Sequence, residues 1–344
     1  MKQWRIGLLG LGISVLAIAM IVSQVDLARL GDALVHARYV YLIPTLIFLV
    51  AGLATRAIRW RVLLNGALPL RRSFNITNVA YLVNGLLPLR MGEVARVWLA
   101  NRADPPVPVL KSASSIIVER LLDLLAVLVM LGFALATSPT LPEDYRTAAT
   151  LTIPLLLIGF AVLIVFASQR SLAQRLLAAV THYLPFARKL NLSTWLDHFL
   201  DGLLPLTRPG LLLRVLFWTG LSWGMSVVAG YIIMFAFYEQ PSWSATALYI
   251  AAAAFVIAVP AVPGNIGTYQ WAIMLAVSAV GYGEPTDPVN VSFAVVVHAT
   301  NLLLYAVVGV LGFMQEGISL GQLTSQVQDF APKQDTYVNE RTQL

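Results

Sequence analysis

The sequence has no cysteine and few charged residues for its length. The absence of thiols excludes disulfides, thiolate catalysis and cysteine-based metal sites. Charged residues make up 12% of the 344 residues and hydrophobic residues 58%, so there are too few polar side chains to cover the surface of a water-soluble protein of this size. The composition therefore predicts an integral membrane protein.

Motifs of nucleotide and hydrolase chemistry are also missing. There is no Walker A motif, no nucleophile elbow and no HExxH sequence, so we expect no enzyme activity and no cofactor. His182 and His198 lack the spacing of metal ligands, so we expect no metal. The net charge of +6 comes from basic residues in short loops beside apolar stretches, a pattern that encodes membrane orientation and not binding of nucleic acid.

Apolar stretches long enough to cross a bilayer organise the chain. A span needs roughly 20 apolar residues, and six windows reach that length. Two further regions, 74–101 and 245–281, are apolar but interrupted by Pro, Gly and polar residues. We predict an all-α polytopic membrane protein with six full spans and two re-entrant helical hairpins. The six windows are 6–23, 40–63, 112–136, 149–167, 211–237 and 288–314.

Both interrupted regions read as helix, turn and helix. The first contains LVNGLLPLRMGEVARVW (82–98) and the second contains VIAVPAVPGNIGTYQW (256–271). Non-helical backbone survives inside a bilayer only where protein or a water-filled cavity surrounds it, and a pair of such breaks at matching places is typical of a transporter's substrate site. The residues predicted to form the turns are Pro88, Gly92, Pro263, Gly264 and Gly267.

Basic residues predict the orientation. With the N-terminus in the cytoplasm, and each hairpin returning to the side it left, only Arg29, Arg38 and Arg146 lie outside, and all other Lys and Arg residues lie inside or near the inner end of a span. If either hairpin crossed fully, this bias would be lost. We therefore predict a multi-pass protein of the inner membrane with both termini in the cytoplasm.

The chain reads as two halves with the same order of elements. In each half the order is span, span, hairpin, span, and the last three elements begin at 40, 74 and 112 in the first half and at 211, 245 and 288 in the second. Because three spans reverse the orientation, the halves are predicted to be inverted repeats. The domains are 1–136 and 137–315, the latter with an amphipathic interfacial segment at 170–208, followed by a disordered cytoplasmic tail at 316–344.

Charged residues inside the predicted membrane region are the strongest signal of a site. Each costs about 2.5 to 3.5 kcal/mol on insertion scales, so they should face the bundle interior and pair with one another. Two interpretations remain open: the charges only tie the first hairpin to the third span, or some of them face a cavity and bind a charged headgroup. These residues are Arg90, Glu93 and Arg96 after the first turn, and Glu119, Arg120 and Asp123 in the third span.

The second hairpin is polar but uncharged. Asn265, Thr268 and Gln270 follow its turn, and His298 and Asn301 are placed in the last span to face it. A lone histidine in a membrane helix is often a hydrogen-bonded packing residue, and that alternative remains open beside a role in binding. The first hairpin is therefore expected to handle charge, and the second to supply shape and movement.

Three segments carry a family resemblance: LLPLRMGEVARVWLA (86–100), SIIVERLLDLLAV (115–127) and PAVPGNIGTYQWA (260–272). They resemble the signature blocks of the lysylphosphatidylglycerol synthase transmembrane-region family, the flippase-like YbhN-type membrane proteins, over about residues 5–315. Leu89 departs from the family pattern, where a small residue is common, and Gln270 departs where an acidic residue is frequent. The resemblance implies a membrane domain without the aminoacyltransferase domain of the fused synthases.

The resemblance further implies movement of a lipid headgroup between leaflets. The expected substrate is a phospholipid or a polyprenyl-phosphate-linked lipid with an anionic or zwitterionic headgroup. Two alternatives remain open. The chain is a non-transporting partner of a lipid synthase or glycosyltransferase, or it is an intramembrane lipid-modifying enzyme that uses Glu93 or Glu119 as a base.

Overall fold

The computed structural model describes residues 27–86, 90–138, 143–183, 196, 200, 204–258, 263–318 and 322. All regular secondary structure in these residues is helical, which confirms the predicted all-α class. The predicted first span at 6–23, the turn residue Pro88 and nearly all of the tail lie outside the described residues. The α-helices are α2 (Leu27–Val35), α3 (Leu42–Leu63), α4 (Leu70–Leu86), α5 (Met91–Asn101), α6 (Val109–Thr137), α7 (Glu143–Ser168), α8 (Arg170–Tyr183), α10 (Pro209–Met234), α11 (Trp243–Ala258), α12 (Thr268–Ala279) and α13 (Pro288–Glu316).

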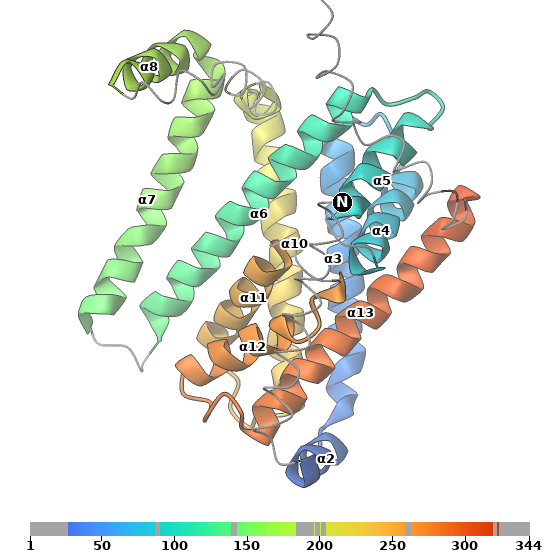
Figure 1. Cartoon of the computed structure of the whole chain (residues 1–344), viewed down its shortest axis with the longest axis vertical. Helices are drawn as coiled ribbons and strands as arrows, with labels where there is room; N and C mark the ends of the chain where they lie inside the picture. Colours follow the sequence, from blue (N-terminus) through green and yellow to red (C-terminus); the bar gives the residue numbers. More distant parts are fainter. Residues whose placement is uncertain are drawn as a thin grey trace, which may run out of the picture.

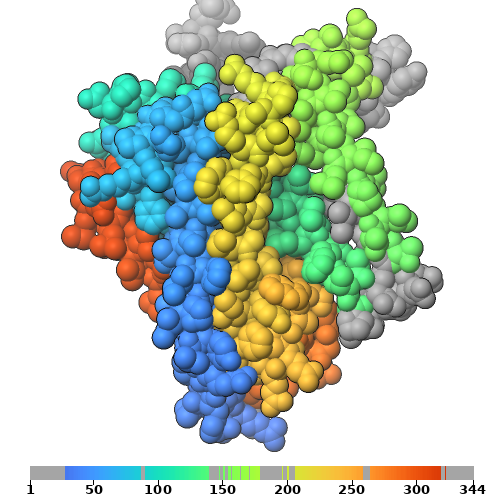
Figure 2. Space-filling view, turned by 180° about the vertical axis from the view of Figure 1, so that it is seen from behind, coloured from blue at the N-terminus to red at the C-terminus, as the bar shows by residue number. Residues whose placement is uncertain are grey.

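Five long helices, α3, α6, α7, α10 and α13, form the frame of the molecule (Figure 1). The shortest of them, α3, has 22 residues, or about 33 Å at the helical rise. Helices α3 and α10 pack against each other along their length, and Figure 2 shows them as adjacent vertical columns. They join the two halves of the sequence along the middle of the face that Figure 2 shows.

Two helical hairpins occupy opposite ends of this frame. The pair α4 and α5 lies toward the end that carries α8, and the pair α11 and α12 lies toward the end that carries α2 (Figure 1). Each hairpin packs against the last long helix of the other half, since α4 contacts α13 and α11 contacts α6. The contact between α4 and α13 in one direction thus corresponds to the contact between α11 and α6 in the other.

Glycine residues, which have no side chain, allow the first hairpin to pack closely. A Cβ atom on Gly92 of α5 would lie 2.0 Å from the carbonyl oxygen of Ala80 on α4, and the Gly92 amide donates to Asn84 Oδ1 at 2.8 Å. Gly309 and Gly312 of α13 make the same kind of approach to α4. Only glycine fits these positions at the observed helix spacing.

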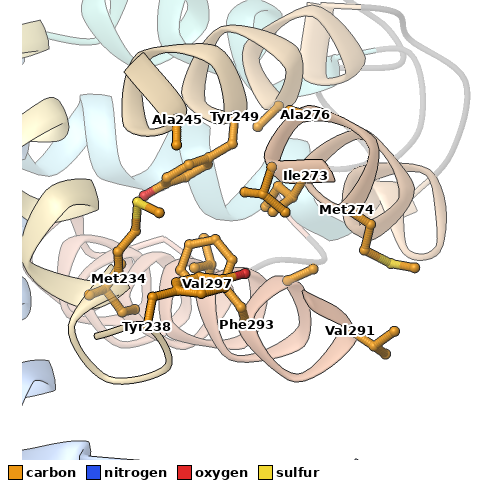
Figure 3. Close-up of a cluster of buried hydrophobic side chains, with 14 of the residues drawn as sticks. Met234, Tyr238, Ala245, Tyr249, Ile273, Met274, Ala276, Val291, Phe293 and Val297 are labelled. Carbon is orange, nitrogen blue, oxygen red and sulfur yellow. The ribbon is translucent and has the colours of Figure 1, made fainter. Parts of the chain in front are cut away.

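The second half has its own apolar core. Tyr249 of α11, Ile273 of α12 and Phe293 of α13 are buried together with Met234 and Tyr238 at the end of α10 (Figure 3). The rings of Tyr238 and Tyr249 meet Phe293 edge to face, with centroids 5.2 Å apart in both cases. This core fixes the second hairpin to the last helix, and Leu30 and Leu42 of the first half pack against it.

Large apolar side chains remain exposed on the outer faces of the long helices, as expected for contact with lipid. Three described helical stretches are long and apolar enough to cross a membrane: Tyr39–Leu63, Pro209–Met234 and Pro288–Glu316. A fourth is counted if Leu157–Ser168 and Ser171–Ala178, bent by 105°, form one broken span. The chain is thus a helical multi-pass membrane protein, and the count of six spans and the re-entrant nature of the hairpins remain predictions.

The predicted interfacial segment 170–208 begins with α8 and ends with a short 3₁₀ turn, Leu204–Thr207. Helix α8 lies across one end of the bundle (Figure 1). Most residues between 184 and 203, including His198, lie outside the described residues.

Candidate functional site

A cavity of about 450 Å³ lies between the two halves. Helices α3, α4, α5 and α6 supply one part of its wall, and α10, α11, α13, the start of α12 and the turn before it supply the other. The tips of the two hairpins approach each other there, because a Cβ atom on Gly264 would lie 3.5 Å from the carbonyl oxygen of Gly85. The cavity is therefore a place where charged and neutral groups from both hairpins come together.

Arg59 of α3 is the centre of a buried ion-pair network beside this cavity. Its Nη1 donates to Asp123 Oδ1 at 2.7 Å, and its Nη2 lies 3.3 Å from Glu119 Oε1. The other oxygen of Glu119 pairs with Nη1 of Arg96, whose guanidinium lies over the ring of Trp60 at 4.0 Å from the centroid. Glu119 thus links α3, α5 and α6 in a position that is 1% exposed.

A second and looser group of charges lies on the cavity wall. Arg120 Nη2 is 3.3 Å from Asp123 Oδ2, and Arg120 Nε is 3.8 Å from Glu93 Oε1. Arg90 Nη2 is 3.1 Å from the same oxygen of Glu93. The side chains of Arg90, Glu93 and Arg120 are 23%, 28% and 34% exposed, whereas that of Arg59 is 1% exposed. These outer charges are accessible to a molecule in the cavity.

The first hairpin reaches this arrangement through an unusual backbone conformation. Arg90 precedes α5 with φ 55° and ψ 39°, the left-handed region that non-glycine residues seldom adopt. The half-helix that follows carries Glu93 and Arg96 at a spacing of three, so both side chains point toward α6. These two charges therefore face the bundle interior and pair with charges of α6.

Basic residues outnumber acidic ones on the cavity wall. Four arginines and two carboxylates line it among the described residues: Arg56, Arg90, Arg96 and Arg120 with Glu93 and Asp123. The buried pair of Arg59 and Glu119 behind the wall adds no net charge. Since charge inside a membrane protein interacts strongly at low dielectric, this excess favours an anion.

The second hairpin contributes polar groups without fixed charge. Asn265, His298 and Asn301 line the cavity, as the sequence predicts. The ring of His298 stacks on Tyr269, with centroids 4.3 Å apart, and hydrogen-bonds to the backbone of Gly264. His298 therefore both packs against the turn and borders the cavity, so the two interpretations of this residue are compatible.

Other predicted residues of the second hairpin hold its turn, and of these only Gly264 also lines the cavity. Gln270 Oε1 accepts from the Gly267 amide at 2.8 Å, and Thr268 Oγ1 donates to the carbonyl of Asn265 at 3.1 Å. Gly264 and Gly267 have φ values of 64° and 87°, which glycine adopts without strain. Pro263 begins the 3₁₀ turn Pro263–Asn265.

A model of the family described as lysylphosphatidylglycerol synthase TM region matches residues 7–309. The chain belongs to this family. The match includes both hairpins and every residue of the charged network, so the site described above lies in the part of the chain that defines membership. Comparisons with curated proteins and with solved structures gave no match.

The structure of this family member adds residues of the cavity wall and of the buried network behind it that sequence reasoning missed. Arg56 and Arg59 lie one turn apart near the end of α3. From the sequence, basic residues at this place are explained by membrane orientation alone. Trp223 Nε1 donates to Asp123 Oδ1 at 3.1 Å, and Ser226 Oγ accepts from Arg56 at 3.1 Å. The available signal was the spacing of three between the two arginines, which puts both on one side of an otherwise apolar helix.

No group of three or more His, Asp or Glu side chains suited to holding a metal ion occurs in the ranges that the structure describes. The acidic residues of the site are each engaged with arginines. The arrangement is a cavity with more arginines than carboxylates on its described wall, held in shape by buried ion pairs.

Proposed function

We propose that this protein moves a lipid with a phosphate-bearing headgroup between the leaflets of the inner membrane. The observation that carries the proposal is the cavity between the two hairpins, with four arginines and two carboxylates on its described wall. Guanidinium groups match phosphate oxygens in a fixed fork, and a polar cavity between apolar helices lets a headgroup enter while its acyl chains stay in the bilayer.

The proposed architecture is six spans and two re-entrant hairpins in inverted repeats. The exchanged contacts of α4 with α13 and of α11 with α6 support it, because a two-fold relation between the halves produces this pairing. Helix α6 has 29 residues, which is long enough to span a membrane. It carries charged residues in its interior, and these are paired within the bundle. The pairing supports the proposal that α6 spans the membrane in spite of its charged residues.

The proposed orientation has both termini in the cytoplasm. The ends of α3 and α5, the starts of α4 and α6, and helix α8 lie toward one end of the molecule (Figure 1). That end carries Arg61, Arg71, Arg72, Arg102 and Lys111. Clustering of basic residues at one end is the pattern expected for the cytoplasmic side.

In the proposed mechanism the arginines of the first half hold the phosphate while the two halves move relative to each other. The contact between α3 and α10 is the natural axis for this movement because it joins the halves along the centre. The loosely paired Glu93 and Arg120, 3.8 Å apart, are placed to separate and re-form as α5 shifts against α6. The buried pair of Arg59 with Asp123 stays intact.

We also propose that the chain performs no chemistry on the lipid. A carboxylate acts as a general base only if one of its oxygens can reach a proton of the substrate, and the carboxylates of Glu93 and Glu119 are both held in ion pairs with arginines. Incubating the purified protein with phospholipid and analysing the lipids by mass spectrometry tests this point. A new lipid product formed by the protein alone would overturn it.

The transport proposal is tested by reconstitution. Full-length protein in phosphatidylglycerol-containing vesicles is assayed for leaflet exchange of a lipid with a fluorescent headgroup, using a quencher that reaches only the outer leaflet. We expect protein-dependent exchange that is largely lost on Arg90→Ala. Arg214→Ala is a matched control, since Arg214 is exposed at the start of α10 and its Nε donates to the carbonyl of Gly210.

If folded wild-type protein gives no exchange above empty vesicles, transport by the chain alone is excluded. The role as a partner of a lipid synthase or glycosyltransferase then becomes the better explanation. If exchange occurs and Arg90→Ala matches the wild type, transport stands but Arg90 is removed from the site.

A further inference from the structure

Arg56 of α3 is held in the cavity wall by neutral partners. Its Nη2 donates to Ser226 Oγ at 3.1 Å, and its guanidinium carbon lies 5.9 Å and 5.6 Å from the ring centroids of Tyr81 and Trp223. It also hydrogen-bonds to the side chain of Tyr305. The aromatic rings orient the guanidinium without neutralising it.

Arg56 differs in this respect from the other arginines of the site. Arg59, Arg90, Arg96 and Arg120 each pair with a carboxylate, whereas no described carboxylate forms an ion pair with Arg56. A guanidinium has five N–H donors, and its two neutral partners leave several of them for an anion. Arg56 is therefore the cation on the described wall whose charge is least compensated.

Both carboxylates on the cavity wall are already engaged. Asp123 accepts from Arg59 through both oxygens, at 2.7 Å and 3.3 Å, from Trp223 at 3.1 Å, and pairs with Arg120 at 3.3 Å. Glu93 pairs with the arginines on either side of it. Since a carboxylate accepts about four hydrogen bonds, Asp123 is saturated. Neither acid on the described wall is free to receive an ammonium group.

The part of the cavity wall contributed by α11, α13 and the turn before α12 carries no Asp, Glu, Lys or Arg among its described residues. Its polar groups are amides, hydroxyls and one imidazole, from Asn265, His298, Thr300 and Asn301 among others. Such groups donate and accept hydrogen bonds without fixed charge, which suits the hydroxyl groups of a glycerol or sugar unit. The cavity thus combines an anion site with a neutral polar site.

From this division we infer that the site selects lipids whose headgroup carries phosphate and uncharged hydroxyl groups, and that it discriminates against headgroups with an ammonium group. Arg56 binds the phosphate, and the neutral wall of the second half binds the hydroxylated part. The inference rests on the proposed function, because it names the substrate class of the same cavity. It predicts exclusion of aminoacylated lipids by this chain.

Binding is measured separately from transport, so that the two proposals can fail independently. Purified full-length protein in detergent is mixed with phosphatidylglycerol, which has phosphate and two hydroxyls, and with lysyl-phosphatidylglycerol, which adds ammonium groups. Native mass spectrometry reports the relative occupancies. We expect phosphatidylglycerol to bind about tenfold or more tightly than the lysylated lipid.

Three variants test the assignment of Arg56. Arg56→Gln is expected to weaken phosphatidylglycerol binding about tenfold. Ser226→Asp, which places a carboxylate against Arg56, is expected to reduce the preference over lysyl-phosphatidylglycerol several-fold or reverse it. Arg214→Gln, at an exposed site outside the cavity, is the matched control and is expected to leave both affinities unchanged.

Equal or tighter binding of the lysylated lipid to the wild type overturns the inference. Unchanged selectivity in a folded Ser226→Asp protein also overturns it, and this test remains usable if Arg56→Gln fails to fold. Selective binding without leaflet exchange supports the inferred selectivity and overturns transport. Exchange of both lipids at equal rates supports transport and overturns the selectivity.

Discussion

Arg59 Nη1 lies 2.7 Å from Asp123 Oδ1, and this ion pair joins the C-terminal part of α3 to the centre of α6. Arg59 is 1% exposed and also reaches Glu119, so the pair is the innermost part of the charged network. The outer charges Arg90 and Arg120 face the cavity instead. The network is therefore divided between a buried part that ties helices together and an accessible part that faces the cavity, and headgroup binding by the accessible part stays a proposal.

Removing Arg59 should destabilise the protein strongly. Arg59→Met leaves Glu119 buried with one cation fewer and takes two hydrogen bonds from Asp123, and breaking a buried pair in this way costs about 3 to 5 kcal/mol. Unfolding in detergent, followed by circular dichroism against denaturant, measures the loss. Arg61→Met is the control, because Arg61 donates to the Leu68 carbonyl near the helix end. A loss below about 1 kcal/mol would contradict a structural role for Arg59.

Adding a methyl group at Gly92 should force apart the two helices of the first hairpin. In Gly92→Ala the new Cβ would lie 2.0 Å from the backbone oxygen of Ala80, so α4 and α5 must move apart, at a cost of about 1 to 3 kcal/mol or more. Gly220→Ala on α10 is the matched change, since nothing lies within 4 Å of a Cβ there. It should be neutral or stabilise by up to about 1 kcal/mol. Equal stability changes in the two variants would refute close packing as the reason for Gly92.

The sequence was a good guide to the helices. The predicted hairpins at 74–101 and 245–281 correspond to helices spanning Leu70–Asn101 and Trp243–Ala279. The length of an apolar stretch and its Pro or Gly interruptions predict where such helices lie and where they break. This works because a backbone in a membrane must satisfy its own hydrogen bonds, which leaves few structures other than a helix. Local signals also set ends: Asp287 caps α13 by accepting from the Val289 amide at 2.9 Å.

The site was predicted only in part. The acidic residues of α6 and the charges of α5 were found because they interrupt apolar sequence. Arg56 and Arg59 were not, because arginines near the end of a span are also explained by membrane orientation. Their role depends on which face of α3 meets α6 and α10, and that is decided by packing across the whole bundle and not by local sequence.

Neutralising Glu93 should separate binding from turnover. Glu93→Gln removes one of two negative charges on the described cavity wall, which releases Arg90 and leaves Arg120 paired with Asp123 alone, so a phosphate headgroup should bind more tightly. A lipid held more firmly leaves more slowly, and leaflet exchange should fall several-fold while the affinity for phosphatidylglycerol rises. Vesicle exchange and native mass spectrometry measure the two quantities. A parallel fall in both would show that Glu93 acts by supporting the fold.

Gln270 offers a test of what an acidic residue at this family position does. Its Oε1 accepts from the Gly267 amide at 2.8 Å and so caps the start of α12, a task that Glu performs equally well at the third position of a helix. Gln270→Glu should therefore keep stability and leaflet exchange near wild-type values. Gln270→Ala, which leaves the amide unpaired, should cost about 1 kcal/mol in the same unfolding experiment. If Gln270→Glu instead makes exchange dependent on a pH gradient across the vesicle membrane, the side chain takes part in proton coupling and its role is not limited to capping.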